Sequence, residues 1–538
     1  MRFQLGRRSG SVVVAVALST AGAVPAVANQ FQEAPPAASV QGLPEDLDAL
    51  LADPRLNGGL AGVVVRKAAT GEVVYSRNGD KRFNPGSNEK VLSSAAALDI
   101  LGPDHRFSTS VSYLGSRRGP IVTGNLYLKG TGDPTMTAAD YDELAAKVKA
   151  AGITRISGGL VADDSWFDRV PLGTEWAWDD EPFAYAAQIS ALTVAVNDVF
   201  DTGVVRVNRG PGTAVGQPAD VTLVPPNNYV KLVNKAVTGA AGSASTVAVA
   251  RDHGTNTIVV TGSIPLGSAP GFNLRTVNDP SLYAASIFRT ALYKHGVNVV
   301  KASTVGVTPD GTTPVTSRQS IPLSQLLPPF LKLSNNGHAE ILTKSIGRKV
   351  HNQGTWSAGL RATSTFLSSV GVNATNLRMV DGAGLSRQDL VTPTEVTALL
   401  QGVQSKPWFT TWYNALPIAG NTAPLVGGTL ANRMNNTAAA NNVHAKTGSL
   451  TSVSALSGYV TNAAGEKLIF SILSKDWITA SGVKSLEDSI AVTLANSGGA
   501  QTAAKRDLAR MPKQRDIRND PTTRVNESML ECSWVQAC

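Results

Sequence analysis

Cysteine is nearly absent from this sequence of 538 residues, which contains only Cys532 and Cys538. Two cysteines at the C-terminus exclude a disulfide framework for the chain as a whole, and they exclude a metal site built from cysteines. In an oxidising compartment the pair either closes a small loop in the tail or is removed with the tail by trimming.

Histidines are also few, and several common catalytic patterns are missing. The six histidines are scattered without metal-ligand spacing, so structural roles are expected for His338 and His444, and we expect no metal and no cofactor. No G-x-S-x-G pattern is present, which argues against an α/β-hydrolase triad. No glycine-rich loop for cradling phosphate is present either.

Long apolar runs are missing after the N-terminus. Arg2, Arg7 and Arg8 precede the apolar run 12–18, and Ala26-Val27-Ala28 has the small-residue pattern of a cleavage site. Residues 1–28 are therefore predicted to be a secretory signal peptide, and the rest is expected to be soluble, secreted and associated with the cell envelope. The formal net charge of +8 loses three arginines with that peptide, so nucleic-acid binding is not indicated.

The patterning predicts an α/β domain assembled from both ends of the chain. Hairpins are predicted at 60–79 and 444–474, and helical periodicity covers much of 337–370, 391–404 and 485–497. The predicted organisation is a discontinuous domain at 40–106 and 318–500, inserted, mainly β material at 107–317 with about 138–200 nested in it, and a charged tail at 501–538.

The segment "PGSNEKVLSSAAAL", residues 85–98, begins like a helix but places Ser87 and Lys90 on one face of its first turn. A lysine there opposes the helix dipole, which favours anions at that end. Alone, the pair is more simply a capping serine with a solvated lysine. A second Ser-x-x-Lys pair, Ser481 and Lys484, is interpreted as surface.

Two further motifs change this interpretation. Ser334-Asn335-Asn336 precedes a helical pattern, and Lys446-Thr447-Gly448-Ser449 begins a strand pattern. Each has a simple structural alternative, since Ser334 could cap its helix and Lys446 could be a strand-edge charge. The order S-x-x-K, S-x-N, K-T-G, with each motif in the secondary structure that its chemistry needs, favours a catalytic role for all three.

With these motifs, the chain resembles the serine penicillin-binding proteins of the D-alanyl-D-alanine carboxypeptidase/endopeptidase class with large insertions (class C low-molecular-mass type). It is most similar to the secreted actinomycete DD-peptidases. Segments such as "KGTGDPTMTAADYDELA", "DDSWFD", "DGAGLSR" and "ECSWVQAC" extend the resemblance over nearly the whole mature chain. The resemblance implies a penicillin-recognising transpeptidase/β-lactamase-like fold, an antiparallel sheet with helices on both faces, with domains inserted after the serine helix.

The resemblance also implies roles. Ser87 is the acylated nucleophile, and Lys90 is its base once burial and positive charge, from the helix end and Lys446, lower its pKa. Ser334 relays a proton to the leaving amine, and Lys446 keeps this network poised. The oxyanion lies between the N–H groups of Ser87 and Ser449. The resemblance also implies that Asn336 binds the amide on the acyl side of the substrate. The strand Thr447-Gly448-Ser449 is implied to bind the terminal carboxylate.

An acyl-side pocket is expected for a diaminopimelate-type side chain. Asp180 in "WDDEPFAYAAQ" is predicted to bind its ammonium, and Arg387 in "DGAGLSRQD" to line the same pocket. Leu385 and Leu450 are predicted to form apolar walls. As simpler alternatives, Asp180 is one of several surface acids and Arg387 makes a structural salt bridge.

The predicted function is therefore a serine D-alanyl-D-alanine carboxypeptidase/endopeptidase, with some transpeptidation left open. Its expected partners are peptidoglycan stem peptides ending in D-Ala-D-Ala and β-lactam antibiotics. The alternatives are a β-lactamase and a non-catalytic penicillin-binding sensor of the same fold. The long insertion argues against the first, and no membrane span supports the second. The oligomeric state is left open.

Overall fold

The structure is a computed structural model, and it describes residues 42–478 and 483–499, all within one compact unit. Ser481, Cys532 and Cys538 lie outside the described residues, as do the predicted signal peptide at 1–28 and the whole predicted tail at 501–538. Within the described ranges, no helix has both the length and the apolar character needed to cross a membrane.

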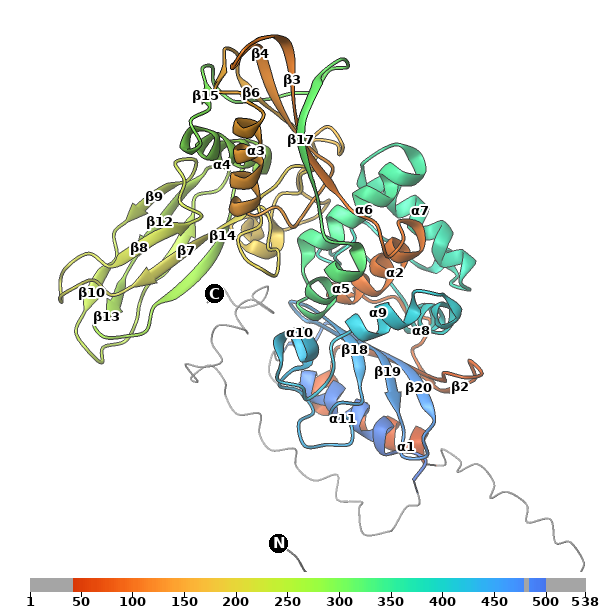
Figure 1. Cartoon of the computed structure of the whole chain (residues 1–538). Helices are drawn as coiled ribbons and strands as arrows, with labels where there is room; N and C mark the ends of the chain where they lie inside the picture. Colours follow the sequence, from red (N-terminus) through yellow and green to blue (C-terminus); the bar gives the residue numbers. More distant parts are fainter. Residues whose placement is uncertain (1–41, 479–482, 500–538) are drawn as a thin grey trace, which may run out of the picture. The chain divides into compact units, whose positions relative to one another are not determined.

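The two ends of the described chain together build a five-stranded antiparallel sheet in the order β18-β19-β20-β1-β2 (Figure 1). Its central strands read as almost continuous apolar runs because both faces are buried. In β20, Phe470 and Ile472 face one core while Ile469 and Leu473 face the other. The strands are β1 (Leu60–Lys67), β2 (Val73–Arg77), β18 (His444–Leu450), β19 (Val453–Thr461) and β20 (Lys467–Lys475).

Helices cover both faces of this sheet. The face that carries Phe470 packs against the two terminal helices, and the face that carries Leu473 packs against the helices that bear the motifs. The terminal pair is α1 (Leu43–Leu50) and α11 (Val483–Asn496), and the opposite layer is α2 (Lys90–Ile100), α5 (Leu323–Lys332), α6 (Asn336–His351), α7 (Trp356–Ser369), α8 (Pro393–Gly402) and α9 (Phe409–Ala415).

One predicted strand is in fact two. In the hairpin predicted at 444–474, residues 444–460 are one arm, whereas the chain turns at Thr451 and Ser452 to form β18 and β19. Ser452 adopts φ 61, a left-handed conformation without the glycine that usually announces such a turn. The turn makes β18 the edge strand of the sheet, where it borders the candidate site.

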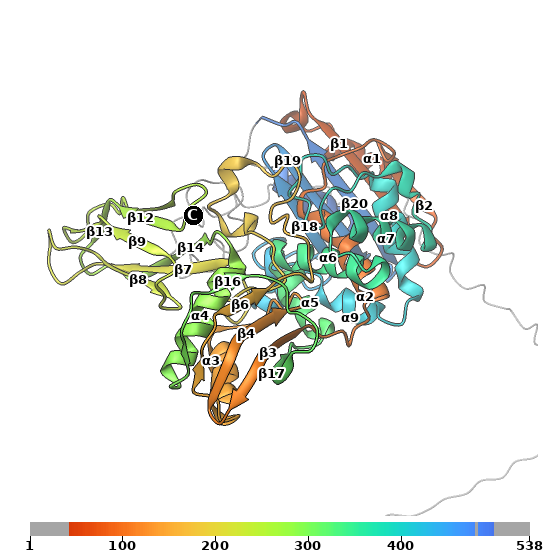
Figure 2. The ribbon, with the colours of Figure 1, turned by 90° about the horizontal axis from the view of Figure 1, so that it is seen from above.

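The inserted material contains a second sheet with its own helices. The long hairpin of β3 and β4 pairs with β17 on one side and with short parallel strands on the other, and two helices pack on this sheet (Figure 2). The elements are β3 (Ser108–Arg118), β4 (Ile121–Gly130), α3 (Ala138–Ala150), β5 (Arg155–Ile156), β6 (Leu160–Asp163), α4 (Pro280–Lys294), β15 (Asn298–Val299), β16 (Thr304–Val305) and β17 (Thr313–Gln319).

Between β6 and α4 lie strands that pair only with one another, so residues 204–276 are nested within the second sheet's chain segment. This differs from the nested segment predicted at about 138–200, because α3 within that range packs on the second sheet together with α4. The nested strands are β7 (Val204–Gly210), β8 (Asp220–Val224), β9 (Lys231–Asn234), β10 (Val237–Gly239), β11 (Ala248–Arg251), β12 (Thr257–Thr261), β13 (Ser263–Pro265) and β14 (Gly271–Thr276).

A largely irregular segment, residues 164–202, runs from the second sheet to the helical layer. It contains only short 3₁₀ turns at Trp178–Asp180 and Ala184–Ala186. Lys344 of α6 is fully buried and donates to the Asp168 carboxylate at 2.6 Å and to the Val170 carbonyl at 2.7 Å. These bonds fix the start of the segment, which then passes the candidate site.

Candidate active site

Ser87 lies in a 3₁₀ turn, Gly86–Glu89, that leads directly into α2. Gly86 has φ +52, and a Cβ built there would lie 2.7 Å from the Ser449 nitrogen, so only glycine lets the turn approach β18 so closely. The Asn88 side chain donates through Nδ2 to the Lys446 carbonyl at 2.7 Å. The first and third motifs are thus joined by this bond and by the close approach of Gly86 to the Ser449 backbone.

Lys90 is fully buried, and its Nζ lies at hydrogen-bond distance from three oxygens. These are Ser87 Oγ at 2.9 Å, Asn336 Oδ1 at 2.6 Å and the Ala383 carbonyl at 2.8 Å. Burial lowers the pKa of Lys90 to about 7, so near neutral pH much of the amine is unprotonated. The structure therefore places a lysine of lowered pKa beside the serine.

The charges around Lys90 differ from the expectation. The carboxyl groups of Glu340, Asp381, Glu89 and Asp389 surround Lys90 and oppose the shift, so burial is the main cause of the lowered pKa of Lys90. Burial and mutual repulsion in turn raise the pKa values of Glu89, Glu340 and Asp389. The sequence analysis missed this buried cluster, because its members come from three separate segments.

Asp381 and Glu340 hold the loop that receives Lys90. The Asp381 carboxylate accepts from the N–H groups of Gly384 at 2.6 Å and Ser386 at 2.8 Å, and Glu340 accepts from Ala383 N–H at 2.8 Å. The "DGAGLSR" segment is therefore a turn wrapped around two buried carboxylates, which fixes the Ala383 carbonyl against Lys90.

Ser334 does not cap α6, because Asn335 does so by accepting from His338 N–H at 3.0 Å. Ser334 instead adopts φ 58, a strained conformation for a residue that is not glycine. Its Oγ accepts from Lys446 Nζ at 2.8 Å, and Lys446 is fully buried on β18. The second and third motifs therefore meet, and Lys446 is not a strand-edge surface charge.

The other residues of the third motif lie along β18, beside the turn that carries Ser87. A Cβ on Gly448 would lie 2.2 Å from the Pro85 carbonyl oxygen, so the strand and the turn touch backbone to backbone. Thr447 donates through Oγ1 to Thr429 Oγ1 at 2.9 Å, a partner that no motif had indicated. Ser449 lies one residue further, beside Gly86.

The residues predicted for the acyl-side pocket also gather at this place. Leu385 and Leu450 form a small apolar cluster with Ala186 and Val453, against which Tyr185 packs. Asp180 accepts from the Tyr185 hydroxyl at 2.6 Å. Burial raises the pKa of Asp180, while the nearby Arg387 guanidinium acts to lower it. Arg387 itself is exposed and donates to the Thr451 carbonyl at 3.4 Å.

Comparison with known proteins identifies the family of this chain. Residues 43–497 match the model of the D-Ala-D-Ala carboxypeptidase 3 (S13) family. The chain belongs to this family. It is 46% identical over 541 residues, 99% of this chain and 97% of the relative, to the D-alanyl-D-alanine carboxypeptidase of Actinomadura sp. (strain R39).

A member of known structure shows the same fold. Penicillin binding protein 4 (dacB) from Haemophilus influenzae superposes with a TM-score of 0.71 at 25% identity, covering 84% of this chain and 98% of that one. The same protein has also been solved complexed with a novel β-lactam. The predicted family and the predicted penicillin-recognising α/β fold are thus confirmed, and the chain is a serine-type D-Ala-D-Ala carboxypeptidase.

Within this S13 chain, one segment of the insertion completes the site. Asn336 donates through Nδ2 to the Tyr185 carbonyl at 2.8 Å, and Trp176 donates through Nε1 to the Asp381 carboxylate at 2.9 Å. Sequence reasoning found Asp180 in this segment but missed Tyr185 and Trp176. The only signal was the density of aromatic residues in "WAWDDEPFAY".

The histidines beside the motifs have structural surroundings. Burial lowers the pKa values of both His338 and His444 to about 4, which keeps their rings neutral. His338 Nε2 lies 2.9 Å from the Phe200 carbonyl, and His444 stacks on Tyr413. Over the described residues, no group of histidine, cysteine or acidic side chains is arranged to hold a metal ion.

Proposed function

We propose that Ser87 is the acylated nucleophile and that Lys90 is its general base. The observation that carries this proposal is the 2.9 Å separation of Ser87 Oγ and Lys90 Nζ, with the pKa of the lysine lowered to about 7. A neutral amine at this distance accepts the hydroxyl proton as the oxygen attacks the carbonyl between two D-alanines.

The tetrahedral intermediate then carries its negative charge toward two backbone donors, the N–H groups of Ser87 and Ser449. The close contact of Gly86 with the Ser449 backbone supports this assignment, because it keeps the serine turn against β18. Donors fixed in the folded backbone need no rearrangement when the charge develops.

The leaving D-alanine needs a proton on its amine, and we assign its delivery to Ser334. Ser334 Oγ accepts from Lys446 Nζ, so its own proton is free to pass to the leaving nitrogen. The proton that Lys90 took from Ser87 then returns to Ser334 Oγ, and the Lys446 ammonium stabilises the negative charge on that oxygen during the transfer. Water then hydrolyses the acyl-enzyme, or another peptide's amine captures it.

The substrate class proposed is the peptidoglycan stem peptide that ends in D-Ala-D-Ala. Thr447 and Ser449 on β18 would bind the terminal carboxylate, and Asn336 the amide on the acyl side. Asp180, with Arg387 and the walls of Leu385 and Leu450, would receive a diaminopimelate-type side chain with its free ammonium. Such a substrate places the enzyme outside the cell, at the wall, in keeping with the predicted signal peptide.

A β-lactam would acylate Ser87 in the same way, and its ring-opened product would block the approach of water. The test is mass spectrometry of the protein with penicillin over time, alongside D-alanine release from a model pentapeptide. We expect a persistent adduct on a peptide containing Ser87, and none in the Ser87→Ala protein. Rapid loss of the adduct would indicate a β-lactamase.

Ser481→Ala is the matched control, because it changes the other Ser-x-x-Lys serine. It should label and release D-alanine like the parent. Labelling that survives in a folded Ser87→Ala protein would overturn the assignment of the nucleophile.

A further inference from the structure

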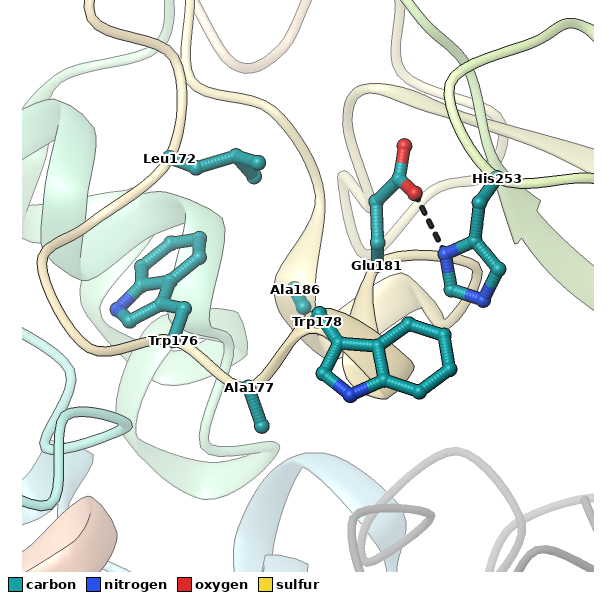
Figure 3. Close-up of a pocket in the computed structure, with 7 residues that line it drawn as sticks. All are labelled: Leu172, Trp176, Ala177, Trp178, Glu181, Ala186 and His253. Carbon is teal, nitrogen blue, oxygen red and sulfur yellow. Dashed lines mark hydrogen bonds and ion pairs between the residues drawn. The ribbon is translucent and has the colours of Figure 1, made fainter.

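A cavity of about 340 Å³ lies beside the acyl-side pocket. Figure 3 shows Leu172 and Trp176 on one side of it and Trp178, Glu181 and His253 on the other. The first four come from the irregular segment 164–202, and His253 comes from the turn between β11 and β12. The volume is at the lower end of the range for small-ligand sites, which suits one ring-sized group.

The cavity borders the acyl-side pocket, because the two share residues. Ala186 lines the cavity and also belongs to the apolar cluster of Leu385 and Leu450. Trp176, another lining residue, packs against that same cluster. Glu181 of the cavity directly follows Asp180 in the chain, so a substrate bound at Asp180 lies next to this cavity.

The charges in the cavity are already balanced. Glu181 accepts from the buried Arg251 guanidinium at 2.7 Å, and its other oxygen lies 2.8 Å from His253 Nδ1. No carboxylate or guanidinium is therefore left to attract an ion, and the site favours a neutral ligand. The Glu181–His253 pair still offers polar atoms at the rim, where His253 is exposed.

The dominant surface of the cavity is aromatic. Trp178 is 75% exposed although it is the largest side-chain type, and it lies tilted on the His253 ring with centroids 4.9 Å apart. A free indole face carries partial negative charge, which attracts the weakly positive C–H groups on the face of a pyranose ring. Exposed apolar surface beside a substrate site is typical of ligand binding.

We propose that this cavity binds an N-acetylated amino-sugar ring at the glycan end of the substrate. The inference rests on the proposed function, in which the peptide cleaved at Ser87 is attached to such a sugar. The ring stacks on Trp178, and its hydroxyl or acetamido groups bond to the rim at His253 and Glu181. The insertion thereby reads the sugar as well as the peptide.

The test compares kcat/KM on a disaccharide pentapeptide and on the same pentapeptide without sugar. We expect the parent to prefer the glycosylated substrate, and Trp178→Leu to lower that ratio about three- to tenfold. Trp178→Phe, which keeps an aromatic face, should retain most of the preference. Tyr293→Ala is the control, because Tyr293 is an equally exposed aromatic on α4, at 78% exposure.

A second readout separates this proposal from the proposed function. Saturation-transfer NMR with a peptide-free dimer of N-acetylglucosamine, on the protein without penicillin, should show contact with the sugar and lose it in Trp178→Leu. An unchanged ratio in Trp178→Leu, or no transfer to the dimer, overturns the sugar site even when Ser87 labels normally. Failure of Ser87 to label overturns the proposed function and leaves the NMR result standing.

Discussion

Lys90 illustrates how one side chain acquires its reactivity from its surroundings. It is enclosed among carboxyl groups that should keep it charged, yet burial outweighs them and lowers its pKa to about 7. The raised pKa values of Glu89 and Asp389 are part of the reason, because a carboxyl group that stays protonated no longer holds the ammonium in its charged form.

The rate of acylation should therefore depend on pH in the neutral range. In the proposed mechanism the neutral amine is the base, so kcat/KM or the penicillin acylation rate should rise with pH through about 7 and fall about tenfold between pH 7 and pH 5.8. Stopped-flow acylation with a chromogenic β-lactam measures this limb. A rate that is flat from pH 6 to 9 would show that Lys90 is not the titrating base.

Asp180 allows a prediction about substrate choice. Asp180→Asn removes the charge that would pair with the substrate ammonium but keeps the shape and the Tyr185 contact. A charge-assisted hydrogen bond contributes about 1.5–3 kcal/mol, or about one to two decades in kcat/KM. The measurement compares a peptide with the free side-chain amine and its acetylated form. The variant should lose most of the preference for the free amine yet still react with simple penicillins, and an intact preference would place the ammonium elsewhere.

At the scale of elements, the decisive contact is the one between the serine turn and β18. It depends on glycine at two places, Gly86 and Gly448, where any side chain would meet backbone atoms of the partner segment. Backbone cannot move aside as a flexible side chain can, so this contact tolerates little change.

Gly448→Ala should therefore separate the turn from the strand. Overpacking against backbone should lower the free energy of unfolding by about 1–3 kcal/mol. The displaced oxyanion donors should raise the free-energy barrier to acylation by at least the same amount. Chemical denaturation and penicillin acylation measure the two effects. Gly465→Ala, in the turn between β19 and β20, is the control, since its φ of +79 strains the backbone of the variant but open space surrounds its Cβ position. Equal effects of both variants on acylation would contradict the role of the contact.

The elements also show what the sequence could reveal. The three motifs and the strand pairs β1–β2 and β19–β20 were predictable, because local periodicity and motif order report on them directly. The turn at Ser452 was not, because nothing in its residues requires φ > 0. The buried carboxylates Glu340 and Asp381 were missed for a different reason: their partners are backbone N–H groups and an indole from distant segments.

At the scale of the whole molecule, the insertion and the catalytic half meet around the start of α6. Asn335 caps this helix and also donates through Nδ2 to the buried Asp201 carboxylate at 3.0 Å, and it stands between the site residues Ser334 and Asn336. A change in the contact between the insertion and Asn335 should therefore alter the positions of Ser334 and Asn336.

Asn335→Asp should show this coupling. The new carboxylate can still cap α6, but it faces Asp201, whose pKa burial already raises. We expect a loss of about 1–3 kcal/mol in unfolding free energy at pH 8, with slower acylation. The pair's raised pKa in the folded state means that its protonated form is favoured by folding, so the loss should shrink as the pH falls toward 5. Asn335→Ala has neither the amide nor a carboxylate at this position, so its loss of unfolding free energy should not shrink as the pH falls. Equal pH profiles for the two variants would contradict the proposed repulsion between the new carboxylate and Asp201.

The pairing of β1 with β20 has a consequence for the order of folding. Leu60 lies opposite Lys475, so the central sheet joins segments more than 400 residues apart in the chain. Loop closure over such a distance is slow, and the second sheet of the insertion can form its local hairpin of β3 and β4 long before. A nascent chain that ends before β18 carries Ser87 and Lys90 but neither Lys446 nor the edge strand, and we therefore expect the proposed nucleophile to become reactive only near the end of synthesis.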